Sequence, residues 1–344
     1  MSEPVSEQML EGLAGEPAYV VGGTVRDELL GRSVLDIDIA CPEPERSARE
    51  YARSSGGAPF PLSRTHGGWR VALPGGTTVD FTPLTGPIED DLATRDFTIN
   101  AIARPLASVA YVDPFDGRAD LESGTLRAVA ESVFVDDPLR LLRAVRFEDE
   151  LGFRMERRTE RLVRENSRLV PRPAGERILE VLRRLTVDGW RRAADLGLLE
   201  PLGGSLELVG RAGAVDSPDY RLVVFLQDSL GLLPISRDLR RYTIALLRST
   251  PPTDSSPRSI HRFRRRTEPW AIDALAFHGR PELAEAVQRA RAADPAEPLV
   301  RGDELGLPPG PVVGETLDQI AEERAAGTIL TKEEALELAR RRTG

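Results

Sequence analysis

The most informative pattern of hydrophobic and polar positions lies between residues 19 and 40. The apolar run Tyr19–Val21 predicts a short buried strand, which ends at the glycine pair Gly22 and Gly23. An amphipathic segment follows and predicts one helix that begins at Thr24 or Val25. Acidic and apolar residues then alternate through the letters DIDIA, which predicts a second strand. The stretch therefore predicts one compact unit of strand, turn, helix and strand.

Two carboxylates share one face of the second predicted strand. Asp36 and Asp38 are two residues apart, so their side chains point the same way, roughly 6 to 7 Å apart at about 3.3 Å of rise per residue. Ile37 and Ile39 point the opposite way, toward a core. The separation suits two carboxylates that bind a divalent metal. A solvated strand end is the ordinary alternative.

The glycine turn suits a phosphate group. Gly22 and Gly23 allow the backbone to approach a ligand closely, and the N–H groups at the start of the next helix favour an anion. A simple turn is the ordinary alternative. Because the carboxylates and the glycines lie within about twenty residues, the combination predicts a nucleotide site, with phosphates on one side and metal on the other.

The next elements indicate a small mixed sheet flanked by helices. Residues 42–56 predict a helix that proline opens and glycine closes. Residues 69–84 alternate across a Pro-Gly-Gly turn, which predicts a hairpin. Asp80 lies on the second strand of this hairpin. It is a possible third carboxylate beside the aspartate pair, or an acid at the edge of the sheet that binds no metal.

From Thr125 onward the apolar spacing becomes helical. The letters FVDDPLRLLRAVRFEDELGF predict a helix with one buried side. Asp137 and Arg140 stand three residues apart and are expected to be neighbours on its polar surface, and Arg143 and Arg146 continue the series. An ordinary salt bridge on a solvated surface is the alternative to a binding site.

A carboxylate and a guanidinium side by side can distinguish nucleobases. Asp137 only accepts hydrogen bonds and Arg140 only donates them. Cytosine and adenine present an exocyclic amine beside a ring-nitrogen acceptor, which fits the pair. Guanine and uracil place a carbonyl oxygen against the carboxylate, which costs about 1 to 3 kcal/mol per unsatisfied group. The pair is therefore expected to admit CTP and ATP and to reject GTP and UTP.

Composition narrows the class of protein. The chain has 344 residues, enough for two or more cooperating units, with no apolar run of the length that spans a membrane. The N-terminal letters MSEPVSEQ do not resemble a signal peptide. The single cysteine, Cys41, excludes an internal disulfide, and three histidines leave little for a zinc site. We expect a cytoplasmic protein without a membrane partner.

Charge is unevenly distributed. The net charge of −9 argues against a protein that binds nucleic acid over its whole surface. Arginines nevertheless concentrate in two segments, 140–192 and 258–266. The letters SIHRFRRRTEPW, which overlap the second segment, predict either contacts with RNA phosphates or a solvated loop with a few anchoring residues.

These motifs resemble the class II tRNA nucleotidyltransferase and bacterial poly(A) polymerase family. The resemblance starts with GGTVRDELLG and DIDIA and continues in TRDFTINA, where Thr94 replaces the first arginine of the family's RRDFTINA. DDPLR resembles the family motif EDxxR, with Asp136 in place of the glutamate. GERI, from Gly175, resembles the next motif. The similarity extends from about Tyr19 to Ala335.

The resemblance implies a fold and a set of roles. The fold class is α+β, with a polymerase-β-like head of residues 1–124 built on a small mixed sheet. An all-α neck (125–195), body (196–278) and tail (279–344) follow and hold the acceptor end and the elbow of tRNA. The implied chemistry is two-metal phosphoryl transfer with Mg2+, CTP and possibly ATP, and no protein partner is implied. The residues that match the family motifs are Asp36 and Asp38 for the metal, Gly22, Gly23, Arg26 and Arg95 for the nucleotide and its triphosphate, Asp96 and Asn100 for the ribose, Asp137 and Arg140 for the base, and Arg143 and Arg146 for phosphate or base.

One departure from the family points to a narrower activity. Only the residues from Phe81 to Asp90 separate Asp80 from Asp91, whereas many full CCA-adding relatives carry a longer segment there. Such shortness resembles relatives that add only two cytidines. CC addition is therefore the prediction, and the alternatives are CCA addition, A addition, poly(A) synthesis and an inactive RNA-binding scaffold. A fused histidine-aspartate phosphohydrolase is not expected, because the histidines, at positions 66, 261 and 278, are too few and too scattered.

Overall fold

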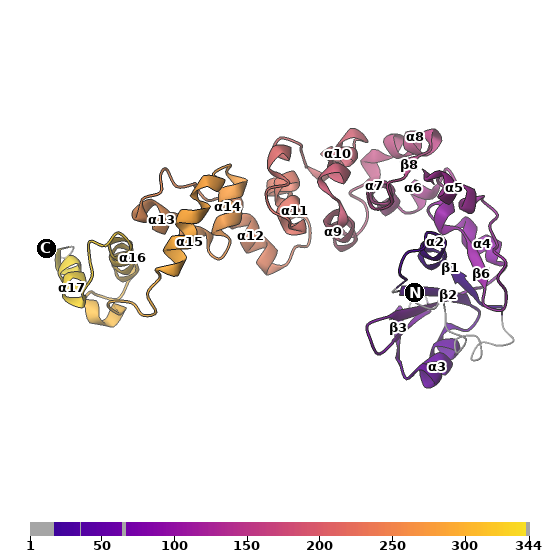
Figure 1. Ribbon diagram of the computed structural model, residues 1–344, viewed down its shortest axis with the longest axis horizontal. Coiled ribbons are helices and arrows are strands. Elements are labelled where there is room, and N and C mark those ends of the chain that lie inside the picture. Colours follow the sequence, from indigo (N-terminus) through magenta and orange to yellow (C-terminus); the bar gives the residue numbers. More distant parts are fainter. Residues whose placement is uncertain (1–16, 35, 64–66, 342–344) are drawn as a thin grey trace. The chain divides into compact units, whose positions relative to one another are not determined.

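The protein is described by a computed structural model, which covers residues 17–34, 36–63 and 67–341 (Figure 1). The N-terminal letters MSEPVSEQ and His66 lie outside these residues. The chain divides into two compact units, Met1–Leu202 and Gly203–Gly344. The finer division into head, neck, body and tail stays a prediction.

A mixed sheet forms the centre of the first part of the chain. In the described residues it has six strands in the order β3-β4-β5-β2-β1-β6. β2 and β5 are parallel, and the other neighbouring strands are antiparallel. The predicted strand pair around the glycine turn, the hairpin and the α+β class are confirmed. The strands are β1 (Tyr19–Val21), β2 (Asp36–Cys41), β3 (Ala58–Ser63), β4 (Gly68–Ala72), β5 (Thr78–Pro83) and β6 (Ala103–Pro105).

Three helices accompany this sheet: α2 (Gly23–Leu29), α3 (Pro44–Ser55) and α4 (Ile88–Ala93). α3 has the predicted ends, because Pro44 fits the first turn and Gly56 adopts the left-handed conformation that closes the helix. Its Tyr51 ring lies 6.0 Å from the Phe81 ring of β5. The apolar side of α3 therefore packs against the central strands.

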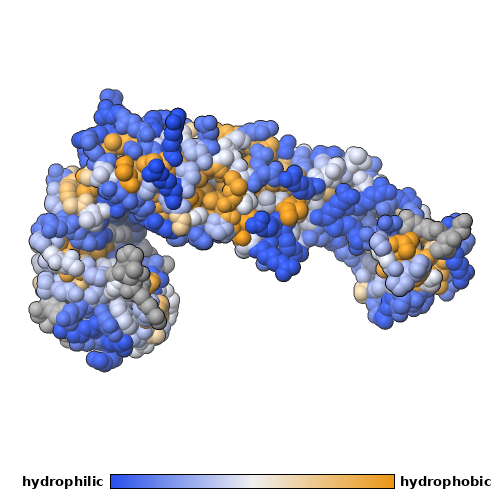
Figure 2. Space-filling model, turned by 180° about the vertical axis from the view of Figure 1, so that it is seen from behind, coloured by the Kyte–Doolittle hydropathy of each residue, from blue (hydrophilic) through white to orange (hydrophobic). Residues whose placement is uncertain are grey.

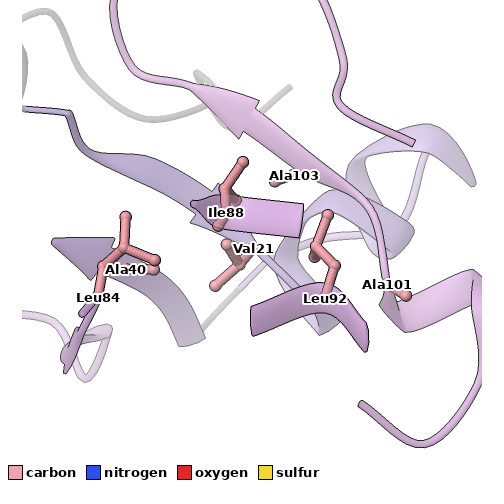
Figure 3. Close-up of a cluster of buried hydrophobic side chains, with 7 residues drawn as sticks. All are labelled: Val21, Ala40, Leu84, Ile88, Leu92, Ala101 and Ala103. Carbon is pink, nitrogen blue, oxygen red and sulfur yellow. The ribbon is translucent and has the colours of Figure 1, made fainter. Parts of the chain in front are cut away.

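Apolar side chains of α4 also pack against the sheet. Figure 3 shows Ile88 and Leu92 of α4 beside Val21 of β1, together with four further buried residues of the cluster. Leu92 is completely buried. This cluster fixes α4 against the strands, and α4 leads directly into the TRDFTINA segment. Its remaining members are Ala40, Leu84, Ala101 and Ala103.

Helices occupy most of the rest of the first unit. The long helix α7 packs against α9 and α10, and its apolar side supplies much of the local core. A two-stranded parallel sheet, β7 (Thr125–Leu126) with β8 (Arg154–Met155), supports it. The helices are α5 (Gly117–Ser123), α6 (Val133–Asp136), α7 (Leu139–Leu151), α8 (Arg157–Glu165), α9 (Gly175–Arg184) and α10 (Val187–Asp195).

The start of α7 differs from the sequence-based expectation. Asp137 was expected on the helix surface beside Arg140, but it has an extended backbone between α6 and α7. The reason is Pro138, which disfavours a helical conformation in the residue before it and is itself compatible with a helix start. Asp137 therefore precedes the helix that carries Arg140.

The second unit is helical. Ser217, Ser236 and Ser256 each accept a hydrogen bond from the N–H three residues later, so that three of its helices begin with a side-chain cap. Val300, Ile320 and neighbouring apolar residues form a separate core near its C-terminal end. The helices are α11 (Pro218–Leu226), α12 (Arg237–Leu247), α13 (Pro257–Thr267), α14 (Ala271–Phe277), α15 (Ala284–Ala292), α16 (Pro311–Ala325) and α17 (Lys332–Arg341).

The basic segment 258–266 is helical, so the predicted solvated loop is wrong. It belongs to α13, and three of its arginines pair with acids of α16. Arg258 bonds Glu323 at 2.6 Å, and Arg262 bonds Glu322 at 2.6 Å. Contacts of this helix with RNA stay a prediction.

Hydrophilic residues cover most of the face shown in Figure 2, and apolar residues form patches between them. This is the surface expected when helices bury one apolar side and leave the other to water. Among the residues that the structure describes, no helix is both long enough and apolar enough to cross a membrane.

Candidate functional site

Strand register brings the predicted metal-binding carboxylates to neighbouring strands. In the parallel pair of β2 and β5, Asp38 lies opposite Asp80, and Asp36 lies opposite Thr78. Directly opposed residues share a face of the sheet, and residues two apart on one strand do so as well. The three aspartates therefore lie on one face, as the sequence predicted for Asp36 and Asp38.

Each carboxylate has a different surrounding. Asp80 accepts two hydrogen bonds from Arg70 of β4, both at 2.6 Å. Asp36 accepts a hydrogen bond from the Thr78 hydroxyl at 2.7 Å. The hydroxyl of Thr24 accepts from the backbone N–H of Asp38 at 2.9 Å, which ties the start of α2 to β2. The glycine turn and the acidic strand are thus held together at one threonine.

Asp38 is the carboxylate most affected by its environment. Burial, together with the negative charges of Asp80 and Asp36, raises the pKa of Asp38 to about 6. Arg95 and Arg70 oppose this rise but do not cancel it. A cation bound beside Asp38 would stabilise its charged form and would lower this pKa.

This pKa predicts how stability changes with pH. Between pH 4 and about 6, folded Asp38 retains a proton that the unfolded chain has lost, so stability falls as pH rises. Up to about 3 kcal/mol is lost above that window. Urea unfolding of metal-free protein at pH 4.5 and pH 7 measures this loss. We expect a smaller loss in Asp38→Asn; equal pH dependence of the two proteins would contradict the assignment.

The donor set fits Mg2+ with two carboxylates. Mg2+ prefers oxygen ligands and is commonly bound by one or two carboxylates, with water and substrate phosphates completing the shell. Within residues 17–34, 36–63 and 67–341, no three His, Cys, Asp or Glu side chains form a group that could hold a metal ion. Asp36 and Asp38 stay the predicted metal ligands, and a metal role for Asp80, which Arg70 engages, stays a prediction as well.

The glycine turn, Arg95 and Asp38 meet in space. Gly22 has φ 68° and ψ −130°, a conformation that favours glycine. A β-carbon on Gly22 would come within 2.5 Å of Arg95 Nη1 and within 3.9 Å of Asp38 Oδ2. Asp91 of α4 holds Arg95 with a 2.8 Å hydrogen bond from Nη2. The structure thus brings together the predicted triphosphate and metal residues.

Gly22→Ala is expected to destabilise the protein by about 1 to 3 kcal/mol, through backbone strain, and to displace Arg95. The rate of nucleotide incorporation should fall by more than the loss of folded protein accounts for. The matched control is Gly31→Ala, because Gly31 also has positive φ, 66°, but an added β-carbon would meet nothing within 4 Å. Urea unfolding and steady-state rates measure both effects. Equal rates in the two variants would show that the contact with Arg95 is unimportant.

The residues predicted to contact the ribose are engaged inside the protein. Asn100 accepts a hydrogen bond from Arg26 Nη1 at 2.9 Å and donates one to Asp96 at 3.0 Å. Asp96 also accepts from Arg143 Nε at 2.7 Å. Burial by itself would raise the pKa of Asp96, but Arg143 and the hydrogen bonds hold it below its ordinary value. Ribose contacts by Asp96 and Asn100 stay a prediction.

The two base-reading candidates have separate partners. Asp137 accepts the N–H of Leu139 at 3.1 Å and a hydrogen bond from Arg177 Nη2 of α9 at 2.8 Å. Arg140 Nη2 donates to the backbone carbonyl of Thr94 at 2.7 Å. α7 is thus attached to the TRDFTINA segment through Arg140.

Arg146 and Gly23 complete the predicted set. Arg146 is largely buried, and its Nε has no hydrogen-bond partner among the residues that the structure describes. Burial, with the charge of Arg143 adding to it, lowers the pKa of Arg146 to about 10, while Glu150 opposes the shift. At Gly23, a β-carbon would come within 3.7 Å of Arg26 Nη2. Arg146 therefore lies near Arg143, and Gly23 lies near Arg26.

The sequence reasoning missed four residues that support these candidates. Arg70 and Arg177 each hold one candidate carboxylate, Asp91 holds Arg95, and Thr24 joins α2 to β2. Arg177 lies in the recognised GERI letters and was available as a candidate. The pairing of Arg70 with Asp80 depends on the register of the hairpin, which no local sequence signal gives.

The comparisons with known proteins agree with this geometry. The model of the Poly A polymerase head domain matches residues 18–83 and 75–127. The A-adding tRNA nucleotidyltransferase of Deinococcus radiodurans is 33% identical over 408 residues, which cover 92% of this chain and 94% of that protein. The chain belongs to the class II tRNA nucleotidyltransferase family.

Two further members of this family of tRNA nucleotidyltransferases extend the comparison. The CC-adding tRNA nucleotidyltransferase of Geobacter sulfurreducens is 44% identical over 174 residues, which cover 50% of this chain and 40% of that protein. The match thus spans less than half the length of that relative. The Thermotoga maritima CCA-adding enzyme, solved in complex with tRNA, has a TM-score of 0.72 at 25% identity and covers 99% of this chain and 97% of that one.

Proposed function

We propose that the protein adds two cytidines from CTP to the 3′ end of tRNA that lacks CCA. The observation that carries the proposal is the short connection after Asp80. β5 ends at Pro83 and α4 begins at Ile88, so that residues 84–87 alone join them. Leu84 and Ile88 are both buried in the cluster that holds α4. This connection leaves no long flexible segment that could rearrange for a second kind of nucleotide.

The chemistry proposed is nucleotidyl transfer with release of pyrophosphate. Asp36 and Asp38 would hold Mg2+, which activates the tRNA 3′-hydroxyl and neutralises charge on the pyrophosphate. Gly22 leaves room for the triphosphate, and Arg95 and Arg26 supply positive charge beside it. No nucleic-acid template is required, because protein side chains read the incoming base.

The base-reading step rests on Asp137 and Arg140. Arg177 fixes the Asp137 carboxylate as a hydrogen-bond acceptor, and Thr94 fixes the position of Arg140. A cytosine would donate its amine to Asp137 and accept at its ring nitrogen from Arg140. A carbonyl oxygen in place of the amine would oppose two acceptors. CTP is therefore accepted and UTP rejected.

Addition of the terminal adenosine is a second candidate. It is favoured by the Deinococcus radiodurans relative, because the match to that A-adding protein extends over 94% of its length. The Asp137 and Arg140 pair also suits adenine, which presents an amine beside a ring-nitrogen acceptor. Because the pair accepts both bases, the two candidates differ in the 3′ end of tRNA that they extend: an end before CCA for CC addition, and an end after CC for A addition.

The test uses three tRNA substrates, which end before CCA, after the first C and after CC. Each receives CTP alone, ATP alone or both. CC addition predicts two cytidines on the first substrate, one on the second and none on the third, and no adenosine on any. Adenosine on the CC-ended substrate alone would establish A addition. Three nucleotides on the first substrate would establish full CCA addition and overturn the proposal.

A further inference from the structure

One buried aromatic ring contacts three arginines of the candidate site. Phe147 of α7 is 2% exposed. The guanidinium carbons of Arg26, Arg143 and Arg146 lie over its ring, at 5.1, 5.2 and 4.7 Å from the centroid. A ring attracts a cation at its face, and this attraction strengthens when water is excluded. Phe147 is thus a shared contact of arginines that α2 and α7 contribute.

Two of these arginines, Arg26 and Arg143, are also the two ends of a hydrogen-bond chain. Arg26 donates to Asn100, Asn100 donates to Asp96, and Arg143 donates to Asp96. Because both Arg26 and Arg143 also lie against Phe147, the ring closes this chain into a loop. The loop connects α2, the TRDFTINA segment and α7, in addition to the hydrogen bond from Arg140 to Thr94.

We propose that Phe147 is a positioning residue that holds Arg26 and Arg143 for binding of the nucleotide triphosphate. The inference rests on the proposed function, because it assigns these arginines to that nucleotide. Asp27 and Asp96 each hold one of these arginines at the edge of its guanidinium group. The aromatic ring adds a contact at the face of the guanidinium and therefore does not compete for the N–H groups that remain for phosphates.

The charges around the ring explain why such a residue is needed. Arg143 and Arg146 repel each other. Arg146 pairs with Glu150, with 3.6 Å between Nε and the carboxylate, and Asp96 adds a smaller attraction. Asp27 and Asp96 each hold one of the other two arginines. The ring adds an attractive contact at the point where these like charges meet.

Phe147 also belongs to the core, so a suitable control is required. Its ring meets that of Phe97 edge to face at 5.6 Å. Phe134 is equally buried and packs on the same Phe97 ring at 6.3 Å. Among the described residues, no arginine lies over the Phe134 ring. Phe134→Leu therefore reproduces the packing loss of Phe147→Leu without the loss of a cation contact.

The experiment compares these two variants in the full-length protein. Equilibrium binding of CTP in the absence of tRNA, KM for CTP, kcat and thermal unfolding are measured for each. We expect Phe147→Leu to weaken CTP binding and to raise KM about tenfold with kcat nearly unchanged, the pattern of lost uniform binding. Phe134→Leu should lower Tm to a similar extent with CTP binding within about twofold of wild type.

A second series separates the electrostatic contact from packing. Phe147 is replaced with phenylalanines that carry one, two and three ring fluorines, which reduce the negative charge of the ring face while nearly keeping its shape. CTP binding should weaken stepwise while Tm stays nearly constant. Unchanged CTP affinity through the series, or equal effects of Phe134→Leu and Phe147→Leu, would overturn the inference. Absence of incorporation by the wild-type protein would instead refute the proposed function, because CTP binding is measured without turnover.

Discussion

The Asp38→Asn variant is expected to lose nucleotide incorporation by about a thousandfold or more, while its affinity for tRNA stays unchanged. Asparagine keeps the shape of the side chain but removes the charge that would hold Mg2+ beside the triphosphate, and metal stabilisation of a phosphoryl-transfer transition state is worth several kcal/mol. Asp38 is also the acid whose pKa burial and the neighbouring aspartates raise to about 6. The variant should therefore unfold at a higher temperature than the metal-free wild type at pH 7.

The matched control for this experiment is Glu89→Gln. Glu89 is an exposed acid of α4, and its substitution removes the same charge without touching the sheet. Single-turnover incorporation of CTP and filter binding of tRNA give the two readouts. Retention of a tenth or more of wild-type activity by Asp38→Asn would exclude the assigned metal role. Loss of tRNA binding together with activity would indicate that the substitution disrupts the fold.

The Asp137→Asn variant is expected to reduce discrimination between CTP and UTP by about a hundredfold. The amide offers a donor where the carboxylate offered only acceptors, so the uracil carbonyl gains a partner, while the cytosine amine loses one. Each change is worth about 1 to 3 kcal/mol, and the two effects combine in the ratio of kcat/KM values. The substitution also weakens the contact with Arg177, which now faces a neutral group.

Asp136→Asn is the control for that prediction. Asp136 is the adjacent acid, and it accepts a hydrogen bond from Ser132 at 2.8 Å rather than facing Arg177. It carries the same charge at nearly the same place, so any general effect of charge should appear in both variants. Competition between CTP and UTP on one tRNA measures the ratio. Equal ratios in the two variants would contradict the base-reading role of Asp137.

Local sequence patterns were sufficient to predict the helices and strands around the carboxylates. The alternation of acidic and apolar residues placed Asp36 and Asp38 on one face of β2, and Pro44 and Gly56 marked the ends of α3. These features depend on periodicity and on the backbone preferences of single residues. Both can be determined from the sequence alone.

Contacts between distant elements could not be predicted in the same way. The position of Asp137 depends on Pro138, because the predicted helix is interrupted there and α7 begins only at Leu139. The pairing of Asp137 with Arg177 joins residues forty positions apart in the chain. Such contacts follow from the packing of α7 against α9, and helical periodicity alone does not fix which arginine reaches which acid.

The basic segment illustrates a further limit. Its arginines were recognised as a concentration of positive charge, yet those that bond α16 are neutralised by its acids. Sequence gives the charge of a segment but not the charge of the surface that it forms after packing. A similar ambiguity applies to Asp80, which is close to Asp38 but is held by Arg70.

The most direct test of the proposed function is the mass of the product formed from tRNA that lacks CCA, in the presence of both CTP and ATP. The proposal predicts addition of two cytidine monophosphates and no further nucleotide, even after long incubation. A product extended by two cytidines and one adenosine would contradict it, and so would a tRNA that remains unextended until a CC end is supplied.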